Sequence, residues 1–141
     1  MYLGHDEHCA FIETFGQSTG ESLVTVAALR ARLLAEVEVT RELRLIDLAD
    51  SGGLARIGAD GRLLDGSHKI SQRWSFALKN HPANPDGILY RARHDPARMS
   101  YALFDNAAGA LSERSMGSLA DSANAPLLAD ILNTYDFGLV D

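Results

Sequence analysis

Two short apolar runs flank a basic turn in the second half of the chain, and together they predict a pair of neighbouring strands. The runs cover residues 88–90 and 101–104, contain aromatic and branched side chains, and are bounded by turn-forming residues. Pro96 lies between them and interrupts any continuous element across the segment. Three arginines are therefore expected at or near strand ends, held by a rigid frame: Arg91, Arg93 and Arg98.

These arginines suit two different roles. Guanidinium groups present N–H donors that match phosphate and carboxylate oxygens, so a rigid frame that carries them can form a pocket for an anionic ligand. The alternative is a solvated basic turn, because most arginines are surface residues. The segment taken alone favours the solvated turn.

The rest of the chain alternates short helical and short strand patterns, which predicts an α+β fold. Apolar periodicity and capping residues, including Asp6 before the first helix, predict helices at 7–14, 24–32, 51–57, 70–80 and 126–132. Short apolar or alternating runs predict strands at 1–3, 33–39, 43–48, 87–91, 99–104 and 137–140, with 33–39 half-buried through its alternation from residue 35 onward. The stretches 58–69 and 107–125 are predicted to be loops.

The composition fits one small folded domain over residues 1–141. Hydrophobic residues make up 46% of the chain, which is too many for a disordered protein, and the net charge of −6 argues against nucleic acid as a partner. No apolar run is long enough for a membrane helix, and charged residues stand where a signal peptide would need an apolar stretch. The single cysteine, Cys9, excludes an internal disulfide and fits the reducing cytoplasm.

Glu13 is the candidate catalytic carboxylate. It lies in the last turn of the first predicted helix, where the helix dipole disfavours a negative charge. No lysine or arginine stands three or four residues before it or four after it, so the helix gives it no ion-pair partner. An ordinary exposed glutamate is the alternative, and the local sequence alone favours that alternative.

Tyr2 is the candidate aromatic partner of this carboxylate. A ring beside a carboxylate can stack on a flat cationic ring, although a tyrosine in the core or on an edge strand fits the local sequence equally well. No metal site is expected, because the histidines do not form a metal-ligand pattern with Cys9. The histidines are His5, His8, His68, His81 and His94.

Taken in order along the chain, a set of short motifs resembles the RES domain, a family named for an Arg, a Glu and a Ser. The motifs are Tyr2-Leu3, Glu13, Leu45-Ile-Asp-Leu48, Gly53-Leu54, Ile70-Ser-Gln-Arg-Trp-Ser-Phe-Ala77, Gly87-Ile-Leu-Tyr-Arg-Ala-Arg-His-Asp-Pro96 and Ala102-Leu-Phe-Asp105. The resemblance extends from Tyr2 to about Gly138.

The resemblance implies an ADP-ribosyltransferase-like fold with a split, twisted β core, flanking short helices and a cleft for NAD. It also implies a toxin of a toxin–antitoxin pair that consumes NAD by cleaving the nicotinamide–ribose bond, with water, phosphate or a protein as acceptor. The implied partner is an Xre-type helix-turn-helix antitoxin. Glu13 would be the catalytic carboxylate, and Tyr2 with Arg91 or Arg93 would bind NAD, all lining a single cleft.

Two departures from the family pattern support an alternative. The family arginine lies on a strand ahead of Tyr2, so the resemblance implies that this chain lacks one or more N-terminal strands. The family serine aligns with Ala92, which has no hydroxyl, and Ser100 is an alternative hydroxyl. The alternative is a degenerate or truncated RES-like domain that binds a nucleotide or an antitoxin without turnover.

Overall fold

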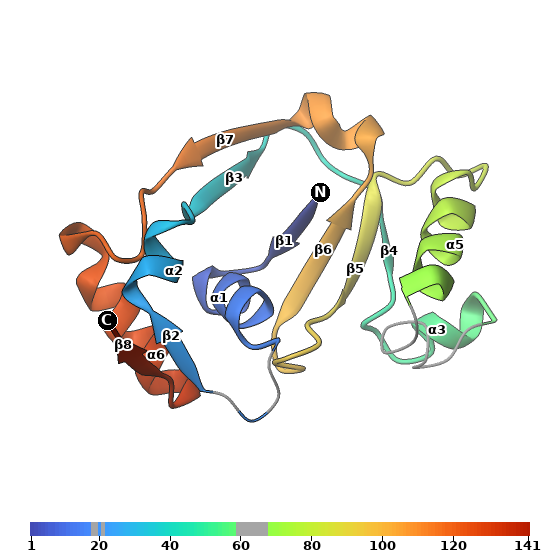
Figure 1. The fold of residues 1–141 in the computed structure, drawn as a ribbon. Helices are drawn as coiled ribbons and strands as arrows, with labels where there is room; N and C mark the ends of the chain where they lie inside the picture. Colours follow the sequence, from blue (N-terminus) through green and yellow to red (C-terminus); the bar gives the residue numbers. More distant parts are fainter. Residues whose placement is uncertain (18–19, 21, 59–67) are drawn as a thin grey trace.

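The computed structural model describes residues 1–17, 20, 22–58 and 68–141, with the backbone alone at 68–72 (Figure 1). Within these residues the chain forms short helices and short strands, as an α+β fold requires. Most of the loop predicted at 58–69 lies outside the described residues. Among the residues that the structure describes, no helix combines the length and hydropathy needed to cross a bilayer.

The central element is a four-stranded sheet in the order β1-β6-β5-β4. Its strands are β1 (Tyr2–Gly4), β6 (Met99–Leu103), β5 (Gly87–Arg91) and β4 (Leu45–Asp47). Strands β5 and β6 pair antiparallel, which confirms the predicted pair of strands around the basic turn. Strand β1 pairs antiparallel with β6 and is an edge strand, whereas β4 pairs parallel with β5.

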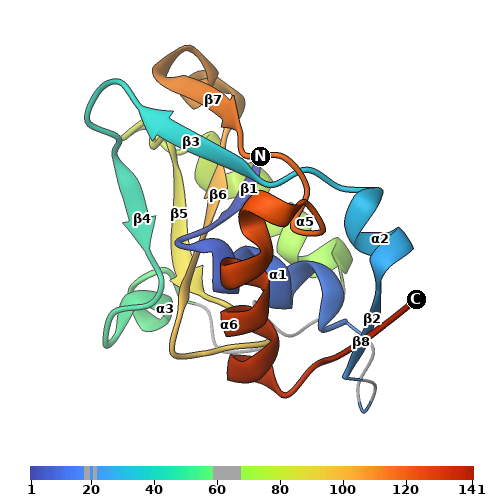
Figure 2. The ribbon, with the colours of Figure 1, turned by 90° about the vertical axis from the view of Figure 1, so that its left-hand side faces the viewer.

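Two strand pairs lie apart from the central sheet. Strand β3 (Ala35–Val39) pairs antiparallel with β7 (Leu111–Ser115), and β2 (Leu23–Thr25) pairs parallel with β8 (Gly138–Val140). Figure 2 shows the β3–β7 ribbon above α1 (Glu7–Phe15), α2 (Val26–Arg30) and α6 (Ala125–Tyr135).

Three sequence predictions need correction. The stretch 107–125 is not a loop, because it contains β7, most of the 3₁₀ helix η1 (Asp105–Ala110) and the 3₁₀ helix η2 (Ser122–Asn124). Residues 24–32 are not one helix, because the hydroxyl of Thr25 accepts a hydrogen bond from the Ala28 N–H at 3.0 Å and starts α2 only after strand β2. Strand β3 is not half-buried along one face, since only Val37 is partly buried there.

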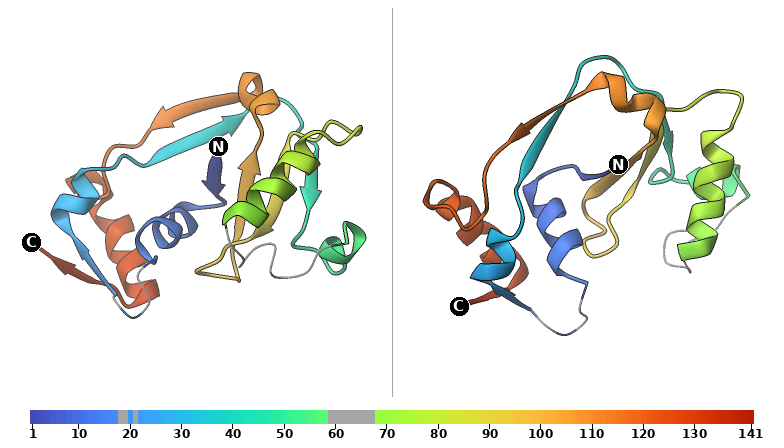
Figure 3. Two further views of the ribbon diagram at one scale, coloured as in Figure 1. Left: turned by 45° about the vertical axis from the view of Figure 1, so that its right-hand side comes forward. Right: turned by 45° about the horizontal axis from the view of Figure 1, so that its top comes forward.

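Two hydrophobic clusters support the sheet and helices. The first joins α1, β2, α2 and α6 through Phe11, Val24, Leu29, Leu119, Leu128 and Ile131. The second lies between the sheet and α5 (His68–Lys79), and its buried members are Leu48, Leu78 and Ile88, with α3 (Gly53–Arg56) at its margin through Leu54. Figures 1 and 3 show α6 and α5 at opposite sides of the central sheet.

An ion pair between a buried carboxylate and a half-exposed arginine joins the start of β5 to the segment before β4. The Asp86 side chain is only 6% exposed, and the Arg41 guanidinium donates to its two oxygens at 2.7 and 3.0 Å. These bonds, together with the Arg44 backbone N–H, lower the pKa of Asp86 to about 2. The ionised carboxylate therefore stabilises the folded state above the pKa of an unfolded aspartate, about 3.9, and this contribution is lost as the pH falls toward 2.

We expect Asp86→Asn to lower the free energy of unfolding at pH 7 by about 1.5–3 kcal/mol, because it removes hydrogen bonds to a charged group. The difference from the wild type should shrink as the pH is lowered from about 4 to about 2, where the wild-type carboxylate also becomes protonated. Urea denaturation at several pH values measures this difference. A difference in the free energy of unfolding that stays constant between about pH 4 and about pH 2 would contradict the assigned role of the ion pair.

Candidate active site

The carboxylate of Glu13 reaches from the last turn of α1 to the loop of the β5–β6 hairpin. Its Oε1 atom accepts a hydrogen bond from the backbone N–H of His94 at 2.8 Å, and the side chain is half-buried. None of the described Lys, Arg or His side chains forms an ion pair with Glu13. The carboxylate is thus held in place by a backbone donor while its charge stays available to a ligand.

Tyr90 is the last residue but one of β5, and the charge of Glu13 acts on its hydroxyl. Burial raises the pKa of Tyr90 to about 12, and the negative charges that Glu13, Tyr2 and Cys9 carry when ionised add to this effect. The Tyr90 hydroxyl is therefore a neutral hydrogen-bond donor at physiological pH, and the charges of Glu13 and Tyr2 act on it.

The register of the sheet shows that Tyr90 and Tyr2 project from the same face. Gly4, Ser100 and Tyr90 lie opposite one another on β1, β6 and β5, so they share one face of the sheet. Tyr2 lies two residues before Gly4 and projects from the same face, with a side chain that is 75% exposed. Tyr2 therefore projects from the same face of the sheet as Tyr90, and its proximity to the Glu13 carboxylate stays a prediction.

Arg91 and Arg93 do not project from this face of the sheet within β5. Arg91 pairs with Met99 and alternates with Tyr90, so it projects from the opposite face of the sheet, and its Nη1 atom donates to the Pro96 carbonyl at 3.1 Å. Arg93 lies beyond the end of the strand and is exposed, one residue before the His94 amide that holds Glu13. Of these two arginines, Arg93 is therefore the nearer along the chain to the His94 amide that contacts Glu13.

Comparison with known proteins identifies the family. The RES domain model matches residues 1–124. The chain belongs to the RES domain family. A protein of Sinorhizobium fredii named "Probable toxin y4kH" is 35% identical over 124 residues, which cover 87% of this chain and 94% of the relative. No solved structure matches the chain.

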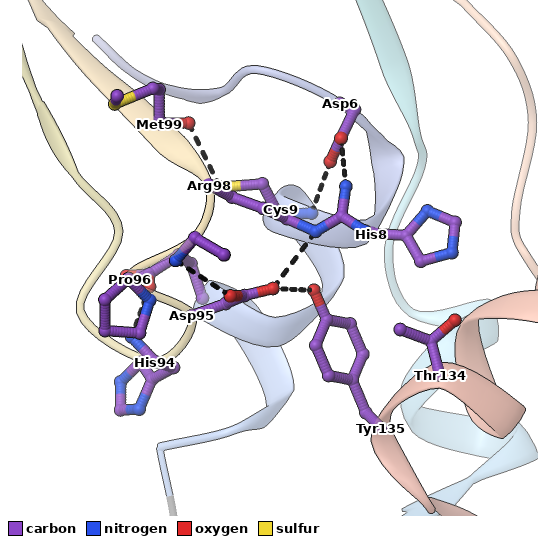
Figure 4. A network of polar contacts seen from close by, with 12 residues as sticks. Asp6, His8, Cys9, His94, Asp95, Pro96, Arg98, Met99, Thr134 and Tyr135 are labelled. Carbon is purple, nitrogen blue, oxygen red and sulfur yellow. Dashed lines mark hydrogen bonds and ion pairs between the residues drawn. The ribbon is translucent and has the colours of Figure 1, made fainter.

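Within this RES domain, the third arginine of the hairpin is held by carboxylates of the chain itself. Arg98 forms an ion pair with Asp6, and its Nε atom donates to Asp95 Oδ2 at 3.0 Å (Figure 4). Burial is the largest single effect and lowers the pKa of Arg98, but the charge of Asp6 and the contacts with Tyr135 and Asp95 together outweigh it, so the pKa is raised. Arg98 therefore serves the fold, and Arg91 and Arg93 remain as candidates for an anionic ligand.

A large cavity of the RES domain adjoins Tyr2 but not the other candidates. It has a volume of about 810 Å³, within the range of small-molecule sites, and lies between β1, α1, residues 41–45 and the β3–β7 ribbon. Tyr2, Leu3 and Phe11 line it, whereas Glu13, Arg91 and Arg93 do not. The arrangement of all four candidates around one cleft therefore stays a prediction.

The position aligned with the family serine is closed to solvent. Ala92 is 2% exposed, and its backbone N–H donates to the Arg98 carbonyl at 2.9 Å. Ser100, the alternative hydroxyl, is 3% exposed and its Oγ atom lies 3.4 Å from Cys9 Sγ. Among the described residues, no group of three or more His, Cys, Asp or Glu side chains forms a metal site.

No motif in the sequence pointed to Tyr90 as a candidate for this site. The only local signal is that Tyr90 stands two residues before Ala92, so that both positions face the same way along an extended strand. Nothing in the sequence indicated a contact for Cys9. Its donor bond to the Met99 carbonyl at 3.2 Å depends on the packing of α1 against β6, which no local pattern indicates.

Proposed function

We propose that this protein is a toxin that consumes NAD by cleaving the bond between nicotinamide and ribose. Membership of the RES family and the relative named as a probable toxin support a toxin-like function. The observation that carries the enzymatic proposal is the Glu13 carboxylate, which accepts the His94 N–H at 2.8 Å and forms no ion pair with a described side chain. A fixed anion in such a place suits a reaction that develops positive charge.

In the proposed reaction the nicotinamide nitrogen leaves with the electron pair of its bond to the ribose carbon. The ribose acquires oxocarbenium character, and Glu13 stabilises this positive charge electrostatically. The exposed ring of Tyr2 stacks on the cationic nicotinamide before the bond breaks. Water, phosphate or a nucleophilic group of a protein then forms the new bond to the ribose carbon and gives up its proton.

Purified protein incubated with NAD tests the proposal directly. We expect nicotinamide to accumulate, with ADP-ribose as the second product if water is the acceptor and a phosphorylated ADP-ribose if phosphate is the acceptor. Parallel reactions with and without phosphate, separated by liquid chromatography, distinguish these acceptors. Nicotinamide at the level of a protein-free blank would contradict the proposal.

The proposed contact to the pyrophosphate of NAD gives a second prediction. We expect Arg93→Ala to raise KM for NAD by about tenfold or more, because a charge-assisted hydrogen bond to phosphate contributes about 1.5–3 kcal/mol, whereas kcat should change little. Arg73→Ala is the matched control, because Arg73 is exposed on α5 and leaves KM unchanged. Equal KM values for the two variants would remove Arg93 from the binding site, and Arg91→Ala would then be measured in the same assay.

The family resemblance also carries our proposals on partner and location. We propose that the protein acts as one domain over residues 1–141, is neutralised by an Xre-type helix-turn-helix antitoxin and works in the cytoplasm, where NAD is available. Co-expression with the protein encoded beside it should relieve growth arrest and yield a complex on size-exclusion chromatography. Growth arrest that persists in the presence of that protein would contradict this pairing.

One observation favours a second function. Ala92 is buried at the position where the resemblance places the family serine, so the site lacks one polar contact of an active enzyme. A non-catalytic RES-like domain would then bind a nucleotide or an antitoxin without turnover. Isothermal titration with NAD distinguishes the two functions, since binding heat without nicotinamide release supports only the second.

A further inference from the structure

We propose that Tyr135, Asp95 and Arg98 are positioning residues that fix the hairpin amide on which Glu13 is held. The proposal rests on the proposed function, because it treats Glu13 as the catalytic carboxylate. Its structural part can be measured without any reaction.

Asp95 is the centre of this network, and it directly follows His94. Its Oδ2 atom accepts hydrogen bonds from the Tyr135 hydroxyl at 2.8 Å and from Arg98 Nε at 3.0 Å (Figure 4). Its Oδ1 atom accepts the Ala97 N–H at 3.1 Å, and its carbonyl accepts the Arg98 N–H at 2.9 Å. The loop is thus closed on itself around Asp95, which limits the freedom of the neighbouring His94 N–H.

The same loop is attached to α1 at both ends of the helix. Arg98 pairs with Asp6, the N-cap residue, whose other oxygen accepts the Cys9 N–H at 2.8 Å. Glu13, in the last turn, accepts the His94 N–H. Two attachments separated along one helix fix the loop against rotation as well as translation, so the position of the Glu13 carboxylate depends on the whole network.

Tyr135 brings a third element into this arrangement. It lies at the end of α6, beyond residues 1–124 that match the family, and α6 is anchored in the first hydrophobic cluster by Leu128 and Ile131. Burial and the hydrogen bond to Asp95 raise the pKa of Tyr135 to about 12, so its hydroxyl remains a donor at physiological pH. The C-terminal helix therefore supports the site through one hydroxyl group.

Tyr135→Phe removes this hydroxyl and keeps the ring. We expect the amide of His94 to exchange its hydrogen about tenfold faster, since the loop that carries it opens more readily, while the Leu48 amide, bonded to the Leu89 carbonyl, exchanges as before. We expect kcat for NAD to fall by about tenfold with KM nearly unchanged, because the variant misplaces a reacting group without removing a substrate contact.

Tyr101→Phe is the matched control. It also removes one tyrosine hydroxyl with a 2.8 Å contact, to His5 Nδ1, but on the other face of the sheet. This variant should leave both the hydrogen exchange rate of the His94 amide and kcat unchanged. A Tyr135→Phe variant that behaves like this control would overturn the proposal, and so would faster exchange at Leu48 and His94 alike.

A double variant separates positioning from general damage. If Tyr135 acts through Glu13, then adding Tyr135→Phe to Glu13→Gln should slow the remaining reaction no further, whereas a full additional tenfold loss would overturn the positioning role. If the wild-type protein releases no nicotinamide, the proposed function fails, and the exchange of the His94 amide then decides alone whether the network holds this amide.

Discussion

Replacing Glu13 by glutamine is expected to slow the release of nicotinamide from NAD by about 10²–10³-fold, the loss typical of a group that stabilises transition-state charge. Glutamine has nearly the same size and its side-chain oxygen can still accept the His94 N–H, so the change removes mainly the negative charge. Initial rates at saturating NAD, followed by liquid chromatography, measure the effect.

The stability of this variant is its internal control. Because Glu13 is only half-buried and has no ion pair with a described side chain, the free energy of unfolding should change by no more than about 0.5 kcal/mol. Glu113→Gln, at an exposed position on β7, should leave the rate unchanged. Full turnover by the Glu13→Gln variant would show that another group stabilises the ribose cation.

Phe11→Ala is expected to have the largest effect on stability, about 3–5 kcal/mol less free energy of unfolding, as for other buried aromatic residues. The ring is 2% exposed and packs against Phe15 and Phe137, at centroid distances of 4.9 and 5.3 Å. Truncation leaves a cavity inside the cluster that joins α1 to α6. Urea denaturation followed by circular dichroism measures the loss.

Phe76→Ala is the matched control for this experiment. The Phe76 side chain on α5 is 70% exposed, so the same chemical change should cost at most about 0.5 kcal/mol. The Phe11→Ala variant should also lose activity, because unfolded molecules are inactive. The loss should match the fraction of molecules that is unfolded. Equal stability losses in the two variants would contradict the assignment of Phe11 to the core.

Local signals predicted the elements whose ends are marked in the sequence. Asp6 caps α1 as expected, and the apolar runs around Pro96 form β5 and β6. Strand β7 was missed because its sequence, Leu-Ser-Glu-Arg-Ser, contains one apolar residue. It is a strand through its pairing with β3, where the Arg114 Nε atom donates to Glu36 at 3.1 Å, and that partner lies far away in the sequence.

For the site, too, local sequence indicated single residues, whereas contacts between distant segments could not be predicted. Spacing and the family resemblance indicated Glu13 and Tyr2, and the contact of Glu13 with the His94 N–H lies outside any local pattern. The role of Arg98 was not predictable, because it depends on Asp6 across the fold. The contact between Tyr135 and Asp95 likewise joins segments that no sequence pattern relates.

The parallel pairing of β2 with β8 has a consequence for the synthesis of the protein. Strand β8 ends one residue before the last residue of the chain, yet it pairs with Leu23–Thr25 near the beginning. Such a contact closes a very long loop, so its entropic cost falls late in folding. A nascent chain can complete this pairing only after Gly138–Val140 has emerged from the ribosome, so the link between β2 and β8 forms later than contacts among the residues made before it.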